Sequence, residues 1–411
     1  MRLTNLTEER GSNRHRISAT VEWEDSDRIA REVFFETTPE FADDLCCDPH
    51  AFLLVGSVRA MRHGERRVAI DAEICPVMHD GLVSAMSLLD SWYPGGSIPT
   101  IEARQQGNPE PRRPRAASML SGGIDSLATV RVNRMRYPRD HDWSIRDCFA
   151  IYGFDLGNQF PDYAARYDAN FSKQQGIFVR RLAGLREIAE ECEVDLIPVY
   201  TNTQSLCDDL GSLAGRYHSA DLAAVAYAFS RRVSITSISS STSIDRLFPY
   251  GSHPLLDPLY SSASMRIVHA DQTLTRLEKS RLVADWDFAL QHLRVCNGWK
   301  EDPHSPLLNC GKCEKCLRTM TALVAFDKLA GTPAFGANDV SEDMLLEGVA
   351  LHRHDQLADW RALIEPLEVR GRRDLVRAIE RIIRRYRWRN APPAVNKVRS
   401  VAGRLRSHLG R

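Results

Sequence analysis

The chain has 411 residues, of which 43% are hydrophobic, so it can bury a full-sized core in two domains or in one domain with an appendage. Its 54 basic and 54 acidic residues cancel, which excludes global electrostatic steering toward nucleic acid or acidic partners. No apolar run reaches the roughly eighteen residues of a transmembrane helix, and residues 1–12 lack the apolar core of a signal peptide. Ten cysteines in so long a chain indicate a metal site in a reducing compartment, so we expect a cytoplasmic enzyme.

Residues 1–110 are predicted to form a small α+β domain. β-Branched and aromatic residues with partial alternation predict four strands, at 16–23, 32–36, 51–58 and 67–75. Helical spacing of apolar residues predicts a helix over 81–92. Residues 99–115 are rich in Pro, Arg and Gln and are typical of a linker. Nothing in this region has the chemistry of a site, and the vicinal Cys46 and Cys47 are interpreted as structural or adventitious.

A glycine-rich loop lies between a predicted strand at 116–120 and a predicted helix. The loop has the sequence Leu120-Ser121-Gly122-Gly123-Ile124-Asp125-Ser126, and the helix has an apolar stripe made of Leu127, Val130, Val132 and Met135. Two glycines let a ligand approach the backbone closely, and the N–H groups at the helix N-terminus favour phosphate. Ser121 and Ser126 add hydroxyl donors, and Asp125 can hold Mg²⁺. An ordinary strand-to-helix turn is the competing interpretation.

The string Ser-Gly-Gly-x-Asp-Ser resembles the signature of the PP-loop ATP pyrophosphatases, also called the adenine nucleotide alpha hydrolase-like superfamily. Its members include GMP synthetase, argininosuccinate synthase, NAD synthetase, tRNA thiolation enzymes and 7-cyano-7-deazaguanine synthase. The resemblance implies that residues 120–126 bind ATP with Mg²⁺ and that Ser121, Asp125 and Ser126 serve catalysis. The loop is not a Walker P-loop, because no G-x-x-x-x-G-K-[ST] string follows it.

From residue 116 onward the pattern alternates strand and helix, which predicts a doubly wound parallel α/β sheet. The predicted strands are 116–120, 148–152, 196–200, 233–237 and 266–270, and the predicted helices between them are 177–191 and 219–231. Ligands of open α/β sheets lie beyond the carboxyl ends of the strands. This rule nominates Asp155, Thr201, Asn202, Ser239–Ser241 and Asp271. By resemblance to PP-loop enzymes, Tyr152 to Asp155 would meet the adenine and ribose of ATP.

Two further segments carry polar groups that could serve a site. Residues 250–257 combine a flexible Gly, a rigid Pro and polar side chains, so they are either a solvated turn or a substrate loop with His253 or Asp257 in the pocket. Residues 276–283 open a helix. In PP-loop enzymes of the deazaguanine branch, a lysine near the start of this helix can face the phosphates, and Lys279 is the matching residue here. A solvated helical lysine is the alternative.

Four cysteines have the spacing of a metal site. Cys296 is followed by Cys310, Cys313 and Cys316, which gives C-x13-C-x2-C-x2-C. Zinc accepts four thiolates in a closed tetrahedral site, and Gly311 suits the tight turn of a knuckle. An iron–sulfur cluster is the main rival, and a redox-active cysteine pair is the third interpretation. Because one site uses all four thiols, we expect it to stabilise the fold.

The PP-loop signature together with this cysteine knuckle and the nearby Arg318 resembles the 7-cyano-7-deazaguanine synthase family over roughly residues 116–330. The resemblance implies adenylation of a carboxylate, followed by attack of ammonia. Three features depart from the family: a whole domain precedes the signature, the gap from Cys296 to Cys310 is longer, and no residues match those that read the deazapurine. A different carboxylate or a different amine therefore fits equally well.

The end of the chain is helical and basic. Residues 345–367 have helical segments, and residues 370–389 predict an amphipathic helix with Leu375, Ile379, Ile382 and Ile383 on one side, before Pro392-Pro393. Asp374 and Glu380 are the only acids from Gly371 onward. Tyr386 and Trp388 lie among arginines, a mixture typical of proteins that meet RNA or anionic membranes. We favour a helix whose apolar side packs on the catalytic domain, and leave a polyanionic partner open.

Three functions follow from these features. The first is an ATP-dependent ligase for a small-molecule carboxylate, with ammonia or an amine from solution or from a partner. The second is an RNA-modifying enzyme of the tRNA thiolation type, although Cys148, Cys192 and Cys207 have no C-x-x-C partner. The third is a non-catalytic assembly protein that retains the fold. The three expected regions are 1–110, 116–330 and 331–411, and a homodimer is among the oligomeric states that the sequence leaves open.

Overall fold

The computed structural model describes residues 1–108, 113–154, 175–207, 211, 213–296, 307 and 309–390. The chain divides into two compact units, residues 1–306 and residues 307–411. The N-terminal region thus belongs to the same unit as the expected catalytic region, and the division into three regions stays a prediction. Among the described residues, no helix combines the length and the apolar composition needed to cross a bilayer.

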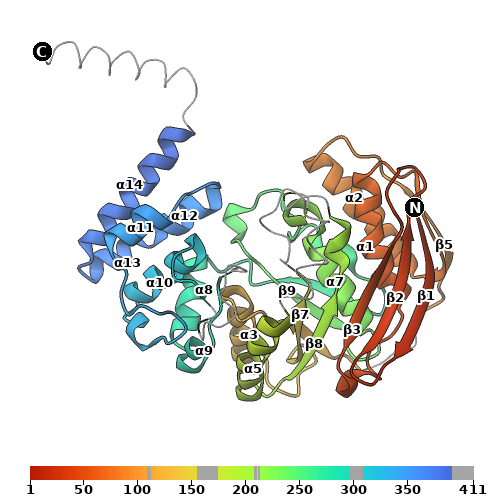
Figure 1. Cartoon of the computed structure of the whole chain (residues 1–411), viewed down its shortest axis with the longest axis horizontal. Helices are drawn as coiled ribbons and strands as arrows, with labels where there is room; N and C mark the ends of the chain where they lie inside the picture. Colours follow the sequence, from red (N-terminus) through yellow and green to blue (C-terminus); the bar gives the residue numbers. More distant parts are fainter. Residues whose placement is uncertain are drawn as a thin grey trace, which may run out of the picture. The chain divides into compact units, whose positions relative to one another are not determined.

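A ten-stranded sheet runs through the first unit in the order β10-β9-β6-β7-β8-β3-β2-β1-β4-β5 (Figure 1). Its strands are β1 (Arg2–Arg10), β2 (His15–Glu22), β3 (Arg31–Thr37), β4 (Arg67–Ile74), β5 (Thr100–Gln105), β6 (Ala116–Met119), β7 (Ile145–Tyr152), β8 (Asp195–Thr201), β9 (Ile235–Ser239) and β10 (Arg266–Ala270). Most neighbouring pairs are parallel, and the antiparallel ones are β1–β2, β2–β3 and β3–β8. The predicted α/β class with a mostly parallel sheet is confirmed.

The helices of the first unit join these strands. They are α1 (Pro49–Arg62), α2 (Pro76–Trp92), α3 (Ile124–Arg136), α5 (Gln175–Glu191), α7 (His218–Ala228), α8 (Arg276–Ala284) and α9 (Asp287–Gln291), with short turns η1 (Pro39–Phe41), η2 (Thr203–Leu206), η3 (Leu213–Tyr217), η4 (Ile244–Arg246) and η5 (Asp257–Tyr260). The chain passes from β6 to β7 to β8 and then returns to β9, on the other side of β6. Right-handed crossovers therefore place α7 on the face opposite α3 and α5. The strand order reverses between β6 and β9, where α/β sheets bind ligands.

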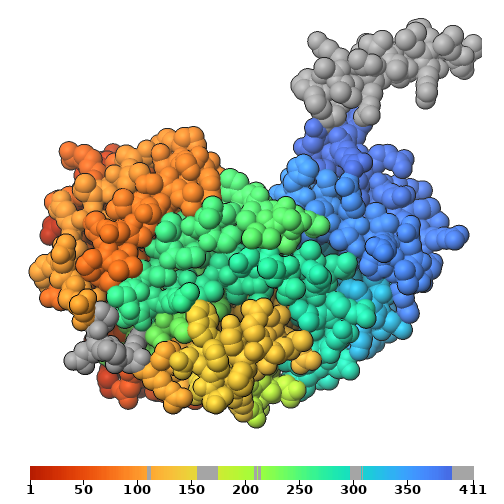
Figure 2. Space-filling view, turned by 180° about the vertical axis from the view of Figure 1, so that it is seen from behind, coloured from red at the N-terminus to blue at the C-terminus, as the bar shows by residue number. Residues whose placement is uncertain are grey.

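The N-terminal region extends the sheet instead of forming a separate layer. β3 pairs antiparallel with β8, so that Phe35 lies opposite Thr201. The Thr201 hydroxyl donates to the Phe34 carbonyl oxygen at 2.7 Å, and the Thr37 hydroxyl donates to the Pro198 carbonyl oxygen at 2.8 Å. Helix α1 packs along α7, and α2 packs on η5. Figure 2 shows the N-terminal residues, in orange, meeting the green segment along one continuous surface.

Three predictions for elements of the first unit are wrong. The strand expected at 51–58 is part of α1, which begins at Pro49 and has Asp48 as its N-cap, with the His50 N–H donating to the Asp48 carboxylate at 3.0 Å. Because this helix is buried on all sides, its apolar run has no amphipathic period. The linker expected at 99–115 contains β5, which pairs with β4. Met135, expected in the apolar stripe of α3, is 69% exposed.

The second unit is helical. Its elements are α10 (Glu314–Ala325), η6 (Leu329–Gly331), α11 (Glu342–Gly348), α12 (His354–Ala362), α13 (Ile364–Val369) and α14 (Arg373–Arg389). The predicted amphipathic helix forms as α14, and its apolar side, with Leu375, Ile379, Ile382 and Ile383, is buried. These side chains pack on α11, α12 and α13 within the same unit. The apolar face of α14 is therefore already covered.

Candidate functional site

The glycine-rich loop continues β6 and leads into α3. The Leu120 N–H donates to the Phe149 carbonyl oxygen at 2.9 Å, which carries the β6–β7 pairing one residue past the strand. Gly122 then takes a left-handed φ of +77°, and Gly123 is the N-cap of α3. Residues 121–126 thus lie at the carboxyl end of β6, beside the point where the strand order reverses.

Close packing explains the two glycines. A Cβ at Gly122 would lie 3.3 Å from Leu185 Cδ2, and its positive φ would strain any L side chain. The Gly122 carbonyl oxygen accepts the Arg294 N–H at 2.9 Å. A Cβ at Gly123 would lie 3.4 Å from the Ser121 Oγ. The loop is therefore held in one conformation by α5 on one side and by the segment that contains Arg294 on the other.

The two serines close the loop on itself. The Ser121 and Ser126 hydroxyls are 3.2 Å apart, and the Ser126 Oγ donates to the Gly123 carbonyl oxygen at 3.1 Å. The Gly123 N–H donates to the Ser121 Oγ at 3.4 Å, which is a long bond. Ser126 is buried and Ser121 is exposed. An incoming anion could therefore bind the Gly123 N–H and the Ser121 hydroxyl, and at the Gly123 N–H it would break only this long hydrogen bond.

Asp125 faces two cations from α8. Arg276 donates from Nη1 to the Asp125 Oδ2 at 2.5 Å, and the Lys279 Nζ lies 3.9 Å from the Asp125 Oδ1. The Asp125 Oδ1 has no hydrogen-bond partner among the described residues. Lys279, only 1% exposed, also donates to the Ser240 carbonyl oxygen at 2.5 Å. This ammonium therefore links the start of α3 to the end of β9.

A second carboxylate lies near Lys279. Asp271 directly follows β10 and has a left-handed φ of +59°, which is uncommon for a residue with a side chain. Burial raises the pKa of Asp271, and the Thr129 side chain and the charge of Lys279 oppose the rise. The charged groups at this end of the sheet thus alternate in sign from Asp125 through Lys279 to Asp271.

Arg276 is the residue that the sequence prediction missed. It is the first residue of α8, which begins at a capping box formed by Thr275 and Glu278. Residues three apart on a helix share a face, so Arg276 and Lys279 point to the same side. The capping box and this spacing together were the signal that could have identified Arg276.

Other nominated residues serve packing. The Tyr152 ring is buried 5.1 Å from the Phe178 ring and 5.8 Å from the Tyr200 ring, measured between centroids. Asp155 lies outside the described residues. The Asn202 side chain binds β3, where its Oδ1 accepts the Phe34 N–H at 2.9 Å. Asn202 and its neighbour Thr201 thus join β8 to β3.

The loop at 250–257 is organised around a buried carboxylate. Asp257 has no exposed surface and accepts hydrogen bonds from the Ser252 hydroxyl and the His253 N–H, both at 2.9 Å. His269 Nδ1 lies 2.7 Å from the same carboxylate. Burial lowers the pKa of His253, with a smaller contribution from His269. The hydrogen bonds of Asp257 therefore fix the shape of this loop.

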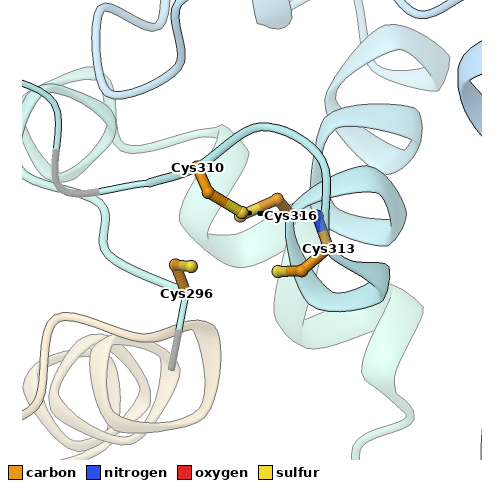
Figure 3. A group of neighbouring side chains, drawn as sticks. All are labelled: Cys296, Cys310, Cys313 and Cys316. Carbon is orange, nitrogen blue, oxygen red and sulfur yellow. Dashed lines mark hydrogen bonds between the residues drawn. The ribbon is translucent and has the colours of Figure 1, made fainter. Parts of the chain in front are cut away.

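Four thiols gather into a potential metal site. The sulfur atoms of Cys296, Cys310, Cys313 and Cys316 all lie within 4.8 Å of one another, and Figure 3 shows the four side chains converging. Tetrahedral zinc with Zn–S bonds of about 2.3 Å places its sulfurs about 3.8 Å apart, so the group is close to the required size. The predicted association of these residues is confirmed at the level of a four-cysteine cluster.

Local backbone geometry shapes this cluster. Gly311 has a φ of +66°, and the N–H groups of Lys312 and Cys313 point at the Cys310 Sγ, at 3.5 and 3.3 Å. Such N–H groups stabilise thiolates. Cys313 is the N-cap of α10, and Cys316 lies in its first turn. The helix N-terminus therefore adds to the positive environment of the sulfurs.

Polar contacts within the second unit orient the start of α10. The Trp360 Nε1 donates to the Glu314 carboxylate at 3.0 Å, and Arg318 donates to the Asp359 carboxylate at 2.7 Å. Arg318 thus ties α10 to α12. Its position beside the cysteines, noted in the sequence, has a packing explanation.

Comparison of the chain with known protein families, with curated proteins and with solved structures found no match.

Proposed function

We propose that this chain is an ATP-dependent carbon–nitrogen ligase of the PP-loop type, which adenylates a carboxylate and joins it to ammonia or an amine. The observation that carries the proposal is the position of residues 121–126 at the switch point of a parallel sheet, with Asp125 beside the buried Lys279. An ordinary strand-to-helix turn has no need of a buried ammonium. Burying the Lys279 ammonium costs desolvation energy, so its presence here favours the binding of an anionic ligand.

The chemistry needs positive charge at the loop. A carboxylate oxygen attacks the α-phosphorus of ATP, so that an O–P bond forms while the bond to pyrophosphate breaks. Backbone N–H groups at Gly123 and the charge of Lys279 would offset the negative charge that develops. The Asp125 Oδ1 has no hydrogen-bond partner among the described residues and would be the atom that holds a Mg²⁺ ion, which would neutralise phosphate oxygens. A neutral nitrogen then attacks the acyl carbon, the bond to AMP breaks, and the nitrogen releases a proton to water.

We infer that the four-cysteine cluster holds zinc in a structural role. All four donors are thiols, which suits a closed tetrahedral site with no open position for a substrate. Cys296 and Cys316 are buried, whereas Cys313 is half-buried and Cys310 is exposed, so the ion would be shielded from solvent on the side of the two buried thiols. A redox role is disfavoured, because one ion would occupy every sulfur of the group.

The thiolation alternative requires a reactive thiol near the loop. Burial raises the pKa of Cys148, and it raises the pKa of Cys192 to about 11. Thiols with raised pKa values are poor nucleophiles at neutral pH. Cys207 is buried beside Arg59, whose Nη2 lies 3.4 Å from the sulfur, and it is the remaining candidate. Loss of activity in Cys207→Ser with zinc retained would favour this alternative over a carboxylate ligase.

We also propose that the exposed side of α14 binds the phosphates of RNA. The helix carries seven arginines, and Arg384, Arg387 and Arg389 are exposed next to Trp388, which is 59% exposed. An amphipathic helix that enters a membrane needs a free apolar face. The apolar face of α14 is covered by neighbouring helices, so the arginines and the aromatic ring favour a nucleic acid over a lipid surface.

The test of the ligase proposal is the fate of ATP. The full-length protein with zinc and Mg²⁺ is incubated with ATP, first with a small-molecule cell extract and then with 7-carboxy-7-deazaguanine and ammonium, and the nucleotides are separated by chromatography. AMP with pyrophosphate, abolished in Asp125→Asn and retained in Asp80→Asn, is the expected result. Asp80 is a suitable control because its side chain is 86% exposed on α2. ADP with phosphate, or no turnover with any addition, would refute the proposal.

A further inference from the structure

A cavity of about 290 Å³ lies between α3 and β10, apart from the glycine-rich loop. Thr129 and Arg136 contribute from α3, Trp143 from the connection to β7, and Asp271 from the end of β10. This volume is near the lower end of the range for small-ligand pockets. It therefore suits a small compound.

The wall of the cavity is built from side chains that are already fixed. Asn133 holds the segment that contains Trp143, since its Nδ2 donates to the Trp143 carbonyl oxygen and its Oδ1 accepts the Ile145 N–H, both at 2.8 Å. The Tyr137 ring stacks beside the Trp143 ring with centroids 6.4 Å apart. The aromatic side of the cavity is thus preorganised, which lowers the cost of binding.

Two opposite charges line the cavity. The Asp271 Oδ2 is buried and has no hydrogen-bond partner among the described residues. A buried carboxylate oxygen without a partner loses the stabilisation that water would give it, so a cationic ligand in the cavity would stabilise the Asp271 carboxylate. Arg136, at the end of α3, is exposed and can accept an anion.

Lys279 connects the cavity to the loop. It contributes to the field at Asp271 and lies 3.9 Å from the Asp125 Oδ1. A ligand bound at Asp271 would therefore be separated by the Lys279 side chain from the loop where the proposed acyl-adenylate forms.

We propose that this cavity binds the nitrogen donor of the reaction, and that the donor is a small zwitterion whose ammonium pairs with Asp271 and whose carboxylate pairs with Arg136. The bound ammonium gives one proton to water before its nitrogen attacks the acyl carbon. This inference rests on the proposed ligase function for the role of the ligand, but not for its binding. Free ammonia would need no anion-binding group, so Arg136 distinguishes an amino acid from ammonia as the donor.

The experiment measures binding in the absence of ATP. The full-length protein with zinc is titrated with glycine, β-alanine, 4-aminobutyrate and 5-aminopentanoate, which vary the separation of the two charges, and with methylammonium and acetate, which carry one charge each. Dissociation constants are obtained by ligand-observed NMR. We expect at least one zwitterion to bind about tenfold more tightly than either single-charge compound, because both ends are paired.

Variants assign each end of the ligand. Asp271→Asn should lower the affinity for the zwitterion and for methylammonium about tenfold. Arg136→Gln should lower the affinity for the zwitterion to that for methylammonium. Arg281→Gln and Asp285→Asn make the same charge changes on α8 and at its C-cap, where both side chains are 57% exposed, and should leave binding unchanged. Because Arg136 is on the surface, its variant tests the proposal even if Asp271→Asn is unstable.

The outcomes separate this inference from the ligase proposal. A protein that converts ATP to AMP but binds none of these compounds, or binds them equally in wild type and Asp271→Asn, overturns the cavity assignment alone. Binding that depends on Asp271 and Arg136, in a protein that releases no AMP, supports the zwitterion site and overturns the ligase.

Discussion

The Lys279 Nζ lies 3.9 Å from the Asp125 Oδ1 and donates to the Ser240 carbonyl oxygen at 2.5 Å. One buried ammonium thereby spans the ends of β6 and β9, the two strands that flank the switch point. Parallel strands leave a crevice at this position, and here a cation lies within it. The cation is fixed before any ligand arrives, which is the arrangement that stabilises developing negative charge.

Replacing Lys279 should therefore affect catalysis more than binding. We expect Lys279→Met to lower kcat for AMP formation by about 10²–10³-fold, with a smaller change in KM for ATP. The measurement is a steady-state assay of AMP release, with a thermal melt to verify folding. Arg281→Met, which removes an exposed cation from the same helix, is the control. A Lys279→Met protein with full activity would show that the ammonium serves only packing.

The N-terminal region should contribute stability through a buried ion pair. Arg59 on α1 and Asp221 on α7 are both fully buried and form two hydrogen bonds, at 2.9 and 3.0 Å. Burial alone would lower the pKa of Arg59, but the nearby Asp221 carboxylate more than offsets this, so the pKa is raised. We expect Arg59→Met to lower the free energy of unfolding by about 3–5 kcal/mol, because Asp221 is left as a lone buried charge.

The double variant Arg59→Met with Asp221→Leu should recover much of this loss, since no buried charge remains unpaired. Urea unfolding of the single and double variants measures both effects. The exposed pair of Arg104 and Asp71 should contribute less than about 1 kcal/mol in the same assay. Equal losses in the free energy of unfolding for the buried and the exposed pair would contradict the expectation.

The metal proposal predicts the metal content. Purified protein should contain zinc in a ratio near one per chain, as measured by inductively coupled plasma mass spectrometry. Cys313→Ser or Cys316→Ser should lose the ion and lower the melting temperature, because metal binding is coupled to folding. Cys47→Ser should retain it, since Cys47 lies outside the cluster. Iron with a visible absorption band would instead identify an iron–sulfur cluster.

The remaining thiols should react according to their raised pKa values. Burial, and then the charge of Glu8, raises the pKa of Cys47 to about 11, and burial raises that of Cys192 to about 11. The thiolate is the minor form below this pH, so alkylation at pH 8 should be much slower than for a free thiol and should accelerate as pH rises toward 11. Iodoacetamide labelling with peptide mass spectrometry measures this. Labelling of Cys192 at pH 7.5 at the rate of free N-acetylcysteine would contradict the expectation.

The α14 proposal predicts a salt-dependent affinity for RNA. Changing Arg384, Arg387 and Arg389 to Gln should weaken binding of a fluorescent single-stranded RNA and reduce the slope of log K against log salt by about 0.7 for each phosphate that is no longer neutralised. Arg361→Gln, at an exposed position on α12, is the control. Binding to anionic vesicles but not to RNA would overturn the proposal in favour of a membrane surface.

The parallel strands β6 to β10 were predictable in outline because short runs with apolar or β-branched residues alternate with helical patterns, although β9 (Ile235–Ser239) lies two residues later than the strand predicted at 233–237. The four-cysteine cluster was predictable because three of its members lie within seven residues. The pairing of β3 with β8 was not predictable, because it depends on contacts between residues far apart in the sequence, such as Phe35 and Thr201. Helix α1 was missed because residues buried on all sides show no helical period, although Asp48-Pro49 is a recognisable helix start.

Part of the candidate site was predictable because it follows from local sequence pattern. Strand ends identify Asp271 and Ser240, and loop composition identifies Asp125, because these depend on local pattern. The pairing of Asp125 with Arg276 arises from the way α8 packs on α3, and the cavity beside Asp271 lies between α3 and β10. Side chains that meet through packing of separate elements leave no signature in sequence spacing alone.

The antiparallel pairing of β3 with β8 has a consequence for how this protein can be divided. Because β3 covers β8, a fragment that starts at residue 116 would leave the backbone donors and acceptors of β8 facing water along an apolar edge. Such an edge recruits other strands and promotes aggregation. The first 105 residues therefore cover the β8 edge of the parallel strands, and we expect a fragment that begins at residue 116 to aggregate.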